Sequence, residues 1–528
     1  MIKPSSICVV ACVAAFLAGS PDLLRGQEFD LVIRNGKILD GTGKAAFAGD
    51  IAVKQGRIAR IGRFDGRGAS EIEAAGKVVA PGFIDVHTHS EPILQLPVAE
   101  NFLRMGITTV VTGNCGGSKL DVAEFFRELV ATRVALNVAT LIGHNTVRNH
   151  AMGGAFMRPP TAAELEKMRA LVDRAMKDGA VGLSTGLIYV PGMYAKSDEI
   201  VALAKVAAAH GGIYASHMRY ENARILEAIE EVCVIAREAN IRAEVSHLKL
   251  SDPNAWGRTG EVIARLERAR ADGLVITHDQ YSYTASATGL NTLIPADARE
   301  GGMKKFAERV KDPAQKAPIV AAMKDTLKRS QRADYSYAVI ASYETEPALN
   351  GKTIPQAAKL KRGSEALDDQ IDLLIELAVN GGAKGVFHNM SEPDVRIFLV
   401  QPLTMIGSDA GPLAFGDAIP HPRGYGNNAR ILGRYVRELK LLTLEEAVRK
   451  MTSLPARTFQ LRQRGEIQPG YVADLVIFDP QTVADRATFD KPHQYAVGFS
   501  EVIVNGVPVI RGGELTDARP GVPVKLAE

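Results

Sequence analysis

The sequence predicts an α/β protein built around a (β/α)8 TIM-like barrel, with a small β-sandwich domain formed by both ends of the chain. In the middle of the chain, short apolar runs typical of buried strands alternate with amphipathic runs typical of helices. Eight strand-like runs occur there, and eight strands close a barrel of this kind. A different pattern, of short antiparallel strands separated by Gly and Asp turns, lies near the two ends.

Length and composition place the chain among ordinary globular proteins. It has 528 residues, of which 46% are hydrophobic and 23% are charged, so it can bury a large core. The formal net charge of +3 forms no basic stripe, which argues against nucleic acid and acidic membrane surfaces as partners. A small-molecule substrate fits this composition better.

The first 26 residues have the pattern of an export signal. Lys3 precedes an apolar run from Ile7 to Leu17 that is short for a bilayer span, and Pro21 follows soon after the run. The alternative is an uncleaved membrane anchor. We expect residues 1–26 to be a signal peptide, a periplasmic or secreted location, and no stable membrane span after removal of the signal, since no later apolar run is long enough.

The predicted β-domain combines residues 27–81 with residues 461–528. The first part contains DLVIRNGKILDGTG, DIAVKQGRIARIG and GKVVAPG, and the second contains ADLVIFDP and EVIVNGVPVI. Each reads as short strands that end at Gly, Asp or Pro. Two half-sheets that flank a long middle segment indicate one small domain completed by both termini.

The barrel is predicted over residues 82–460. Helical runs such as residues 161–179 and 197–212 have polar starts and Gly stops. The charged, partly helical stretch from about 290 to 385 is too long for a connection, so we expect an insertion before the last strand that forms a lid or small subdomain. The predicted strands are residues 82–89, 108–115, 137–144, 180–187, 212–219, 243–250, 274–283 and 404–411.

Residues with metal-ligand chemistry recur where these strands end, which is the working face of such a barrel. Residues two apart on a strand share a face, so His87 and His89 can both point into the barrel mouth. Imidazole, thiolate and carboxylate groups together suit zinc, and three protein ligands would leave a position for water. A single strand-end histidine is more often structural, but six such residues on five strands favour a metal site: His87, His89, Cys115, His217, His247 and Asp409.

Several motifs together resemble one enzyme family. They run from the first β-domain through nearly the whole barrel to the segment 465–479: APGFIDVHTHSE, TTVVTGNCG, GLSTGLIYVPG, YASHMRYE, VSHLKL, YSYTAS, GSDAG and HPRGYG. In this combination the sequence is similar to the N-acyl-D-amino-acid deacylases, or D-aminoacylases, of the amidohydrolase superfamily. The resemblance implies a zinc-dependent enzyme that hydrolyses the amide bond of N-acyl-D-amino acids.

The resemblance also implies a role for each metal-ligand residue. The tightly held Zn²⁺ would be bound by Cys115, His217 and His247. A second, weaker position would use His87, His89 and Asp409 and share Cys115. Many amidohydrolases bridge two metals with a lysine from the fourth strand; residues 180–192 contain no lysine, and the Cys115 thiolate is the natural substitute.

The predicted reaction uses the metal and one carboxylate. Asp409 would take a proton from metal-activated water and return it to the leaving amine, although by itself it could be an ordinary turn residue. Arg423 is the candidate for bidentate pairing with the substrate carboxylate. The resemblance adds Tyr189, Lys249, Tyr283 and Ser286 as substrate-binding residues. For each of these side chains, packing or a solvated loop position is the alternative.

Two other kinds of function remain open from the sequence. A cyclic amidase, hydantoinase-like or dihydroorotase-like, or a dipeptidase would belong to the same superfamily, but the cyclic amidases usually carry the bridging lysine. A non-catalytic metal-binding or ligand-binding protein could use the same scaffold. The position of Asp409 argues against it, because a structural zinc site closes its fourth position and needs no general base.

Overall fold

The structure is a computed structural model that describes residues 27–526, so the predicted signal peptide lies outside the described residues. Its centre is a ring of parallel strands. Each predicted strand segment contains a strand, and the third is divided at Leu141. In chain order the strands are β6 (Phe83–Asp85), β7 (Ile107–Thr112), β8 (Asn137–Thr140), β9 (Ile142–Gly143), β10 (Gly182–Gly186), β11 (Ile213–His217), β12 (Arg242–Val245), β13 (Ile276–Gln280) and β17 (Thr404–Ile406).

Two contacts close the ring. The strands form the ladders β6-β7-β8 and β9-β10-β11-β12-β13-β17. A parallel bridge between Thr88 and Ala410 joins β6 to β17, and the amide of Val181 donates to the carbonyl of Thr140 at 2.9 Å, which joins β8 to β10. The α/β fold predicted from the alternating pattern is therefore present, with the first and last predicted strands as neighbours.

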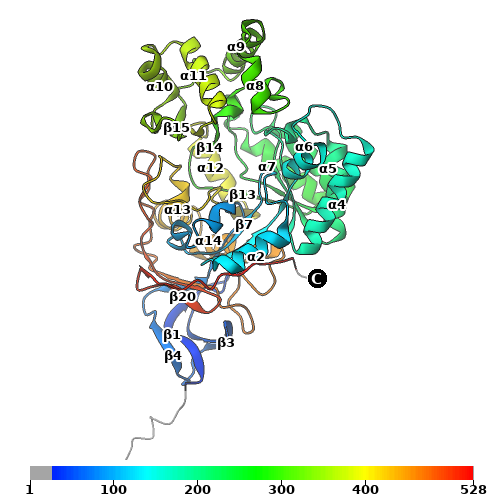
Figure 1. Cartoon of the computed structure of the whole chain (residues 1–528). Coiled ribbons are helices and arrows are strands. Elements are labelled where there is room, and N and C mark those ends of the chain that lie inside the picture. Colours follow the sequence, from blue (N-terminus) through cyan, green and yellow to red (C-terminus); the bar gives the residue numbers. More distant parts are fainter. Residues whose placement is uncertain (1–26, 527–528) are drawn as a thin grey trace, which may run out of the picture.

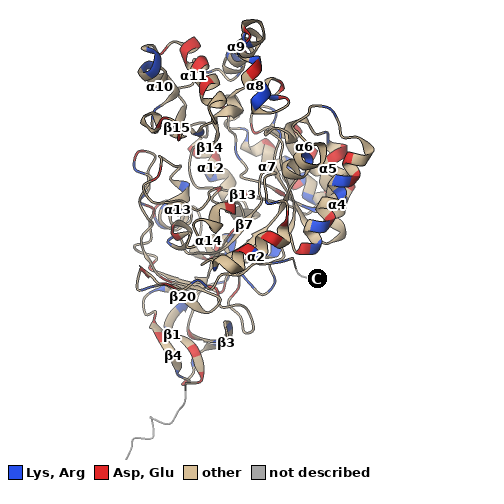
Figure 2. Ribbon diagram, viewed as in Figure 1, with Lys and Arg blue, Asp and Glu red and all other residues tan. Residues whose placement is uncertain are grey.

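Helices pack around the outside of this ring (Figure 1). Helix α4 (Ala162–Asp178) shows why such segments are helical: Thr161 and Glu164 form a capping box at its start, and Gly179 ends it at a φ of 112°. Its buried side chains are Met168, Val172, Ala175 and Met176, which recur at helical spacing along one face. In Figure 2, acidic and basic residues are interspersed on the outer helices. Within residues 27–526, no helix is long and apolar enough to span a bilayer.

The small domain, at the bottom of Figure 1, contains strands from both ends of the chain. Hydrogen bonds connect them in one nine-stranded network. Its two parts meet at β1 (Phe29–Ile38), which has a bulge between Ile33 and Gly36 and pairs with β4 (Gly68–Glu73) before the bulge and with β5 (Val78–Pro81) after it. The other members are β2 (Phe47–Lys54), β3 (Arg57–Gly62), β18 (Leu475–Phe478), β19 (Phe499–Val504), β20 (Val507–Arg511) and β21 (Glu514–Leu515).

Two C-terminal segments extend beyond this sheet. Between β18 and β19, the side chain of Asp485 reaches Tyr283 and Arg430, which follow the barrel strands. After β21, the chain runs back to the barrel, where Pro523 forms a parallel bridge with Val138 of β8. The described part of the C-terminal segment predicted at 461–528 therefore contributes to the barrel as well as to the β-domain expected there.

The predicted insertion has its own sheet and core. Strands β14 (Ser286–Gly289), β16 (Lys384–Phe387) and β15 (Ala338–Ser342) pair in that order. Helices α8 (Met303–Arg309), α9 (Pro313–Arg329), α10 (Ile354–Arg362) and α11 (Leu367–Val379) surround a separate apolar cluster that includes Phe306, Leu349 and Leu374. We call residues 286–387 the inserted subdomain. It lies on the side of the barrel away from the β-domain (Figure 1).

His278 on β13 is a buried histidine whose neighbours keep it neutral. Thr404 donates its hydroxyl proton to the carbonyl of Phe398, so His278 Nε2 donates to the Thr404 oxygen at 2.8 Å. The other ring nitrogen faces the guanidinium of Arg270 at 3.4 Å. Burial, together with the nearby charges of Arg270 and Lys450, lowers the pKa of His278 from 6.5 to about 3.

This environment predicts a loss of stability in weak acid. Because the folded pKa is lower than the unfolded one, His278 contributes stability above about pH 6.5 that is lost as the pH falls toward 3. Below the unfolded pKa the loss is about 1.4 kcal/mol per pH unit. His278→Gln keeps a donor and an acceptor but does not titrate, so its unfolding midpoint in urea, measured on metal-free protein, should fall less than that of wild type between pH 7 and pH 5. Equal losses in the two proteins would refute this role.

Candidate active site

The predicted metal-ligand residues meet at one mouth of the barrel because each lies at or just after the end of a parallel strand. Three of them have left-handed backbone conformations, with φ values of 53° at Cys115, 36° at His247 and 52° at Asp409. Non-glycine residues in this region carry strain of about 1–3 kcal/mol each and cluster at functional sites. The backbone is therefore strained at three strand ends, and at each of them it directs a side chain into the barrel mouth.

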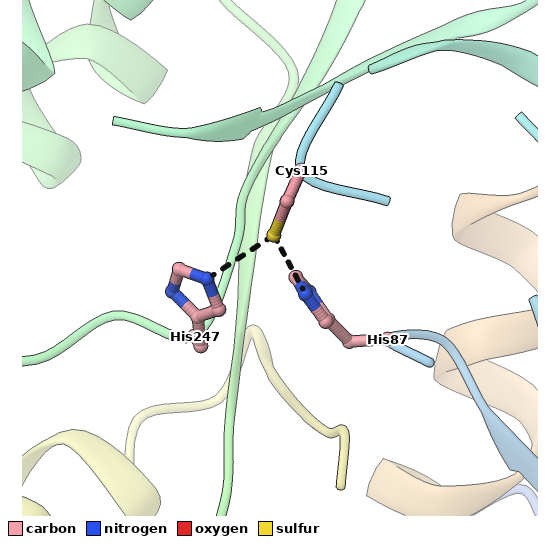
Figure 3. Close-up of side chains that lie close together, drawn as sticks. All are labelled: His87, Cys115 and His247. Carbon is pink, nitrogen blue, oxygen red and sulfur yellow. Dashed lines mark hydrogen bonds between the residues drawn. The ribbon is translucent and has the colours of Figure 1, made fainter. Parts of the chain in front are cut away.

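Cys115 lies among three imidazoles. Its Sγ is 3.3 Å from His87 Nε2, 3.5 Å from His217 Nδ1 and 3.6 Å from His247 Nε2. Figure 3 shows the thiol between His87 and His247. Burial opposes ionisation of the thiol, but the charges of His87 and His217 and the hydrogen bonds outweigh it, so the pKa of Cys115 lies well below its usual value. The site therefore favours a thiolate, which is the form that binds metals.

The spacing of these atoms fits a divalent metal. In a tetrahedral zinc site, bonds of about 2.3 Å to sulfur and about 2.0–2.1 Å to nitrogen separate the two ligand atoms by about 3.6 Å. The three sulfur–nitrogen distances agree with that value. Three groups of ligand atoms lie mutually within 4.8 Å: His87, Cys115 and His247; His87, His89 and Asp409; and His217, Glu221 and His247. The predicted ligands thus all take part in one cluster.

Asp409 connects this cluster to Arg423. One carboxylate oxygen lies 3.2 Å from His89 Nε2 and 3.7 Å from His87 Nε2, and the other lies 2.9 Å from Arg423 Nη2. Burial alone would raise the pKa of Asp409, but the Arg423 charge and the His89 hydrogen bond hold it well below its usual range. Asp409 is therefore ionised at neutral pH and can accept a proton.

Two buried carboxylates that the sequence analysis did not identify lie behind the imidazoles. Glu221 Oε1 is 3.1 Å from His247 Nδ1, its Oε2 is 3.8 Å from His217 Nε2, and Lys249 Nζ is 2.5 Å from Oε1. Asp279 Oδ2 is 3.2 Å from His87 Nδ1. Carboxylates in this position orient metal-binding histidines. Glu221 lies in the YASHMRYE motif, and Asp279 lies on a predicted strand. Each is close in sequence to a histidine, and that closeness is the signal that could have identified them.

A cavity of about 640 Å³ opens beside the cluster, and its wall includes His217 and Asp409. Three predicted substrate-binding residues line it. The centroid of the Tyr189 ring is 4.9 Å from that of His217, and the Tyr189 hydroxyl accepts a hydrogen bond from Thr288. Ser286 donates a hydrogen bond to Asn389. Lys249 forms an ion pair with Glu221.

The other two predicted substrate-binding residues do not line this cavity. The Tyr283 hydroxyl donates to Asp485 at 3.1 Å. Arg423 is buried behind Asp409 and stacks on Tyr281, with its Cζ 4.5 Å from the ring centroid. One of its nitrogens, Nη1, is buried without a hydrogen-bond partner. Within the described residues, Nη1 of Arg423 therefore has no acceptor and can donate a hydrogen bond to a ligand, beside the Asp409 carboxylate that pairs with Nη2.

Comparison with known proteins identifies the family of this site. Residues 70–510 match the model of the amidohydrolase family. The chain belongs to the amidohydrolase family. It is 36% identical over 520 residues to D-aminoacylase from Alcaligenes xylosoxydans xylosoxydans, covering 94% of this chain and 97% of the relative. It is 35% identical over 508 residues to the N-acyl-D-glutamate deacylase of that organism, covering 92% and 94%.

Solved structures of amidohydrolases share the fold. A crystal structure of D-aminoacylase has a TM-score of 0.80 at 34% identity and covers 94% of this chain and 100% of its own. N-acyl-D-glutamate deacylase from Bordetella bronchiseptica, solved with zinc and a phosphonate inhibitor, has a TM-score of 0.80 at 36% identity, with coverage of 94% and 99%. A D-hydantoinase has a TM-score of 0.56 at 15% identity, which shows the fold alone.

The carboxylate of Glu221 should strengthen metal binding at the amidohydrolase site. A metal on His247 Nε2 leaves the ring proton on Nδ1, where it can donate to Glu221. We expect Glu221→Gln to lower zinc affinity about tenfold to a hundredfold, measured by competition with a chromophoric chelator.

The matched control for this measurement is Asp279→Asn, which removes the carboxylate behind His87. It should leave the affinity at Cys115, His217 and His247 within a few fold of wild type. An unchanged affinity in Glu221→Gln would show that Glu221 only pairs with Lys249.

Proposed function

We propose that this amidohydrolase hydrolyses the amide bond of N-acyl-D-amino acids, releasing a D-amino acid and a carboxylate, with zinc held by Cys115, His217 and His247. The observation that carries the proposal is the Cys115 thiol within 3.6 Å of three imidazole nitrogens. The relatives named D-aminoacylase and N-acyl-D-glutamate deacylase match over more than nine-tenths of the chain and support the same substrate class.

Zinc bound here would lower the pKa of a water molecule and polarise the scissile carbonyl. Asp409 would accept the proton of that water, since its carboxylate is ionised and lies on the cavity wall. The protonated Asp409 would then return that proton to the leaving amine. The histidines His87 and His89 face the same carboxylate and form a second, weaker metal position in this proposal.

The site fits the two alternative functions, a cyclic amidase and a non-catalytic metal-binding protein, less well. The cyclic amidases of this superfamily usually carry a bridging lysine, and strand β10 has the sequence GLSTG with no lysine. A purely structural metal would not need an ionised carboxylate that borders an open cavity of substrate size. Both alternatives can be tested in one substrate panel.

The panel consists of N-acetyl-D-amino acids and N-acetyl-L-amino acids, a substituted hydantoin and a dipeptide, assayed with zinc-loaded protein. We expect turnover of N-acetyl-D-amino acids above all others. Asp409→Asn should retain zinc at Cys115, His217 and His247 but lose about a hundredfold to ten-thousandfold in kcat, because it removes the general base. If wild type turned over no N-acetyl-D-amino acid, the proposed function would be wrong; an Asp409→Asn variant within a few fold of wild type would remove only the role of Asp409.

Arg423 should bind the α-carboxylate of the substrate through the nitrogen that Asp409 does not use. The test compares wild type and Arg423→Ala on an N-acyl-D-amino acid and on its carboxamide. We expect kcat/KM for the free carboxylate to fall about tenfold to a hundredfold more than for the carboxamide, as expected for loss of one charge-assisted hydrogen bond. An equal loss on both substrates would show that Arg423 acts only on Asp409 and would leave Lys249 as the carboxylate partner.

A further inference from the structure

Glu244 on β12 is an acid inside the barrel, where apolar side chains usually fill the space. Its sequence neighbours Ala243 and Val245 belong to the apolar core that includes the outer helices, so Glu244 points to the inside. Glu244 is 1% exposed. A buried acid is destabilising unless it is neutral or paired, so the groups around Glu244 determine its state.

The acid that Glu244 meets is Asp279 on the neighbouring strand. Glu244 pairs in register with Thr277 of β13, so Asp279 lies two residues closer to the barrel mouth on the same inward face. The side chains of Glu244 and Asp279 are within hydrogen-bonding distance of each other. Because two ionised carboxylates can only accept, this hydrogen bond requires a proton on one of them.

Each of the two acids has one oxygen with a donor and one oxygen without. Glu244 Oε2 accepts from the Ser246 hydroxyl at 2.9 Å, and Asp279 Oδ2 lies 3.2 Å from His87 Nδ1. Within the described residues, Glu244 Oε1 and Asp279 Oδ1 are buried and have no hydrogen-bond partner. One proton between these two oxygens would satisfy both.

Other ways to satisfy the two oxygens fit less well. The backbone next to Asp279 Oδ1 supplies no donor: a Cβ added at Gly407 would lie 2.7 Å from Oδ1, but the Gly407 amide donates to the carbonyl of Gln280. A cation would need more ligands. Even with Asp85 Oδ2, which is also buried without a partner, three free oxygens are half of the about six or more that Ca²⁺ or Mg²⁺ takes.

The surroundings of the two acids indicate which of them holds the proton. Asp279 faces the ring nitrogen of His87, which needs an acceptor when a metal occupies the other nitrogen. Glu244 has only the neutral Ser246 hydroxyl on its other oxygen. Burial, together with the charge of Asp279, raises the pKa of Glu244 well above its usual value. Glu244 is therefore the donor and Asp279 the anion.

We propose that Glu244 is a positioning residue that donates its carboxyl proton to Asp279 and thereby fixes His87 for the second metal position. The inference rests on that metal position, given with the proposed function, and does not depend on the substrate. With Oδ1 held by Glu244, Asp279 can accept from His87 Nδ1 in one orientation. This leaves His87 Nε2, 3.3 Å from Cys115 Sγ, for the metal.

Two variants of Glu244 separate the donor from the charge. Glutamine has the shape of the protonated acid, so in Glu244→Gln the amide can donate to Asp279 and the oxygen can accept from Ser246. Glu244→Leu removes both groups at similar size. Each protein is loaded with one zinc ion, and binding of a second Zn²⁺ is measured by competition with a chromophoric chelator.

Glu244→Gln should bind the second ion within a few fold of wild type. Glu244→Leu should bind it about tenfold to a hundredfold more weakly, as expected when a partner of a metal-binding histidine is disturbed. The affinity for the first ion, at Cys115, His217 and His247, should change little in both variants.

Glu501→Leu is the matched control for the loss of a buried acid. Glu501 lies in the β-domain, is 7% exposed and also has a buried oxygen without a partner. This variant should leave the affinity for the second ion unchanged, which separates a general loss of stability from an effect at His87.

Infrared spectroscopy tests the proton itself, without the second metal and without turnover. The spectrum of zinc-loaded wild type minus that of Glu244→Gln, at neutral pH, should contain the carbonyl stretch of a protonated carboxyl group. If Glu244→Leu fails to fold, this band decides: its presence supports the proposal, and its absence shows that Glu244 is ionised and overturns it.

The metal measurements can overturn the proposal independently. They do so if Glu244→Gln loses as much affinity for the second ion as Glu244→Leu, if Glu244→Leu loses none, or if Glu501→Leu loses an equal amount. A wild type that binds a single zinc ion would also reject the positioning role. Failure to hydrolyse N-acyl-D-amino acids would instead reject only the proposed function, since neither measurement uses a substrate.

Discussion

Several charged side chains must be held together, largely out of water, at the mouth of this barrel. Cys115, Asp409 and Glu221 favour negative charge there, while Lys249 and Arg423 are cations, and the histidines lie between them. Each buried charge would be destabilising alone, so each is stable only beside its partners. Removing one partner therefore affects its neighbours, and the protonation state of every group depends on the others.

The barrel meets this requirement through the ends of its strands. Parallel strands end at one face, so residues at the ends of β6, β7, β11, β12 and β17 converge, although the first and last lie more than three hundred residues apart in sequence. The left-handed backbone at Cys115, His247 and Asp409 turns each chain at the point where the strand ends. Metal binding to the convergent ligands would offset part of this local strain, which links the stability of the barrel mouth to its occupancy.

The fold and the clustering of the ligand-type residues could be predicted because both follow from local patterns. Strand runs, helix caps and ligand-type residues at strand ends are visible in single segments, as at His87 and Cys115. Tyr283 was expected to touch substrate, but it contacts Asp485, about two hundred residues away, and no local pattern predicts that pairing. Glu221 was missed for the opposite reason: it lies four residues after His217, but a glutamate after a strand is usually solvent-exposed, and only the position of His247 makes it a buried partner.

The cluster of ligand-type residues and much of the cavity wall come from different parts of the chain. The cluster is built from barrel strand ends, whose positions are fixed by hydrogen bonds between neighbouring strands. The opposite wall of the cavity comes largely from the inserted subdomain, which has its own apolar core. Because the two cores are separate, side chains on the subdomain wall can change without disturbing the metal ligands. The side chains of the subdomain wall therefore shape the cavity independently of the ligand-type residues at the barrel mouth.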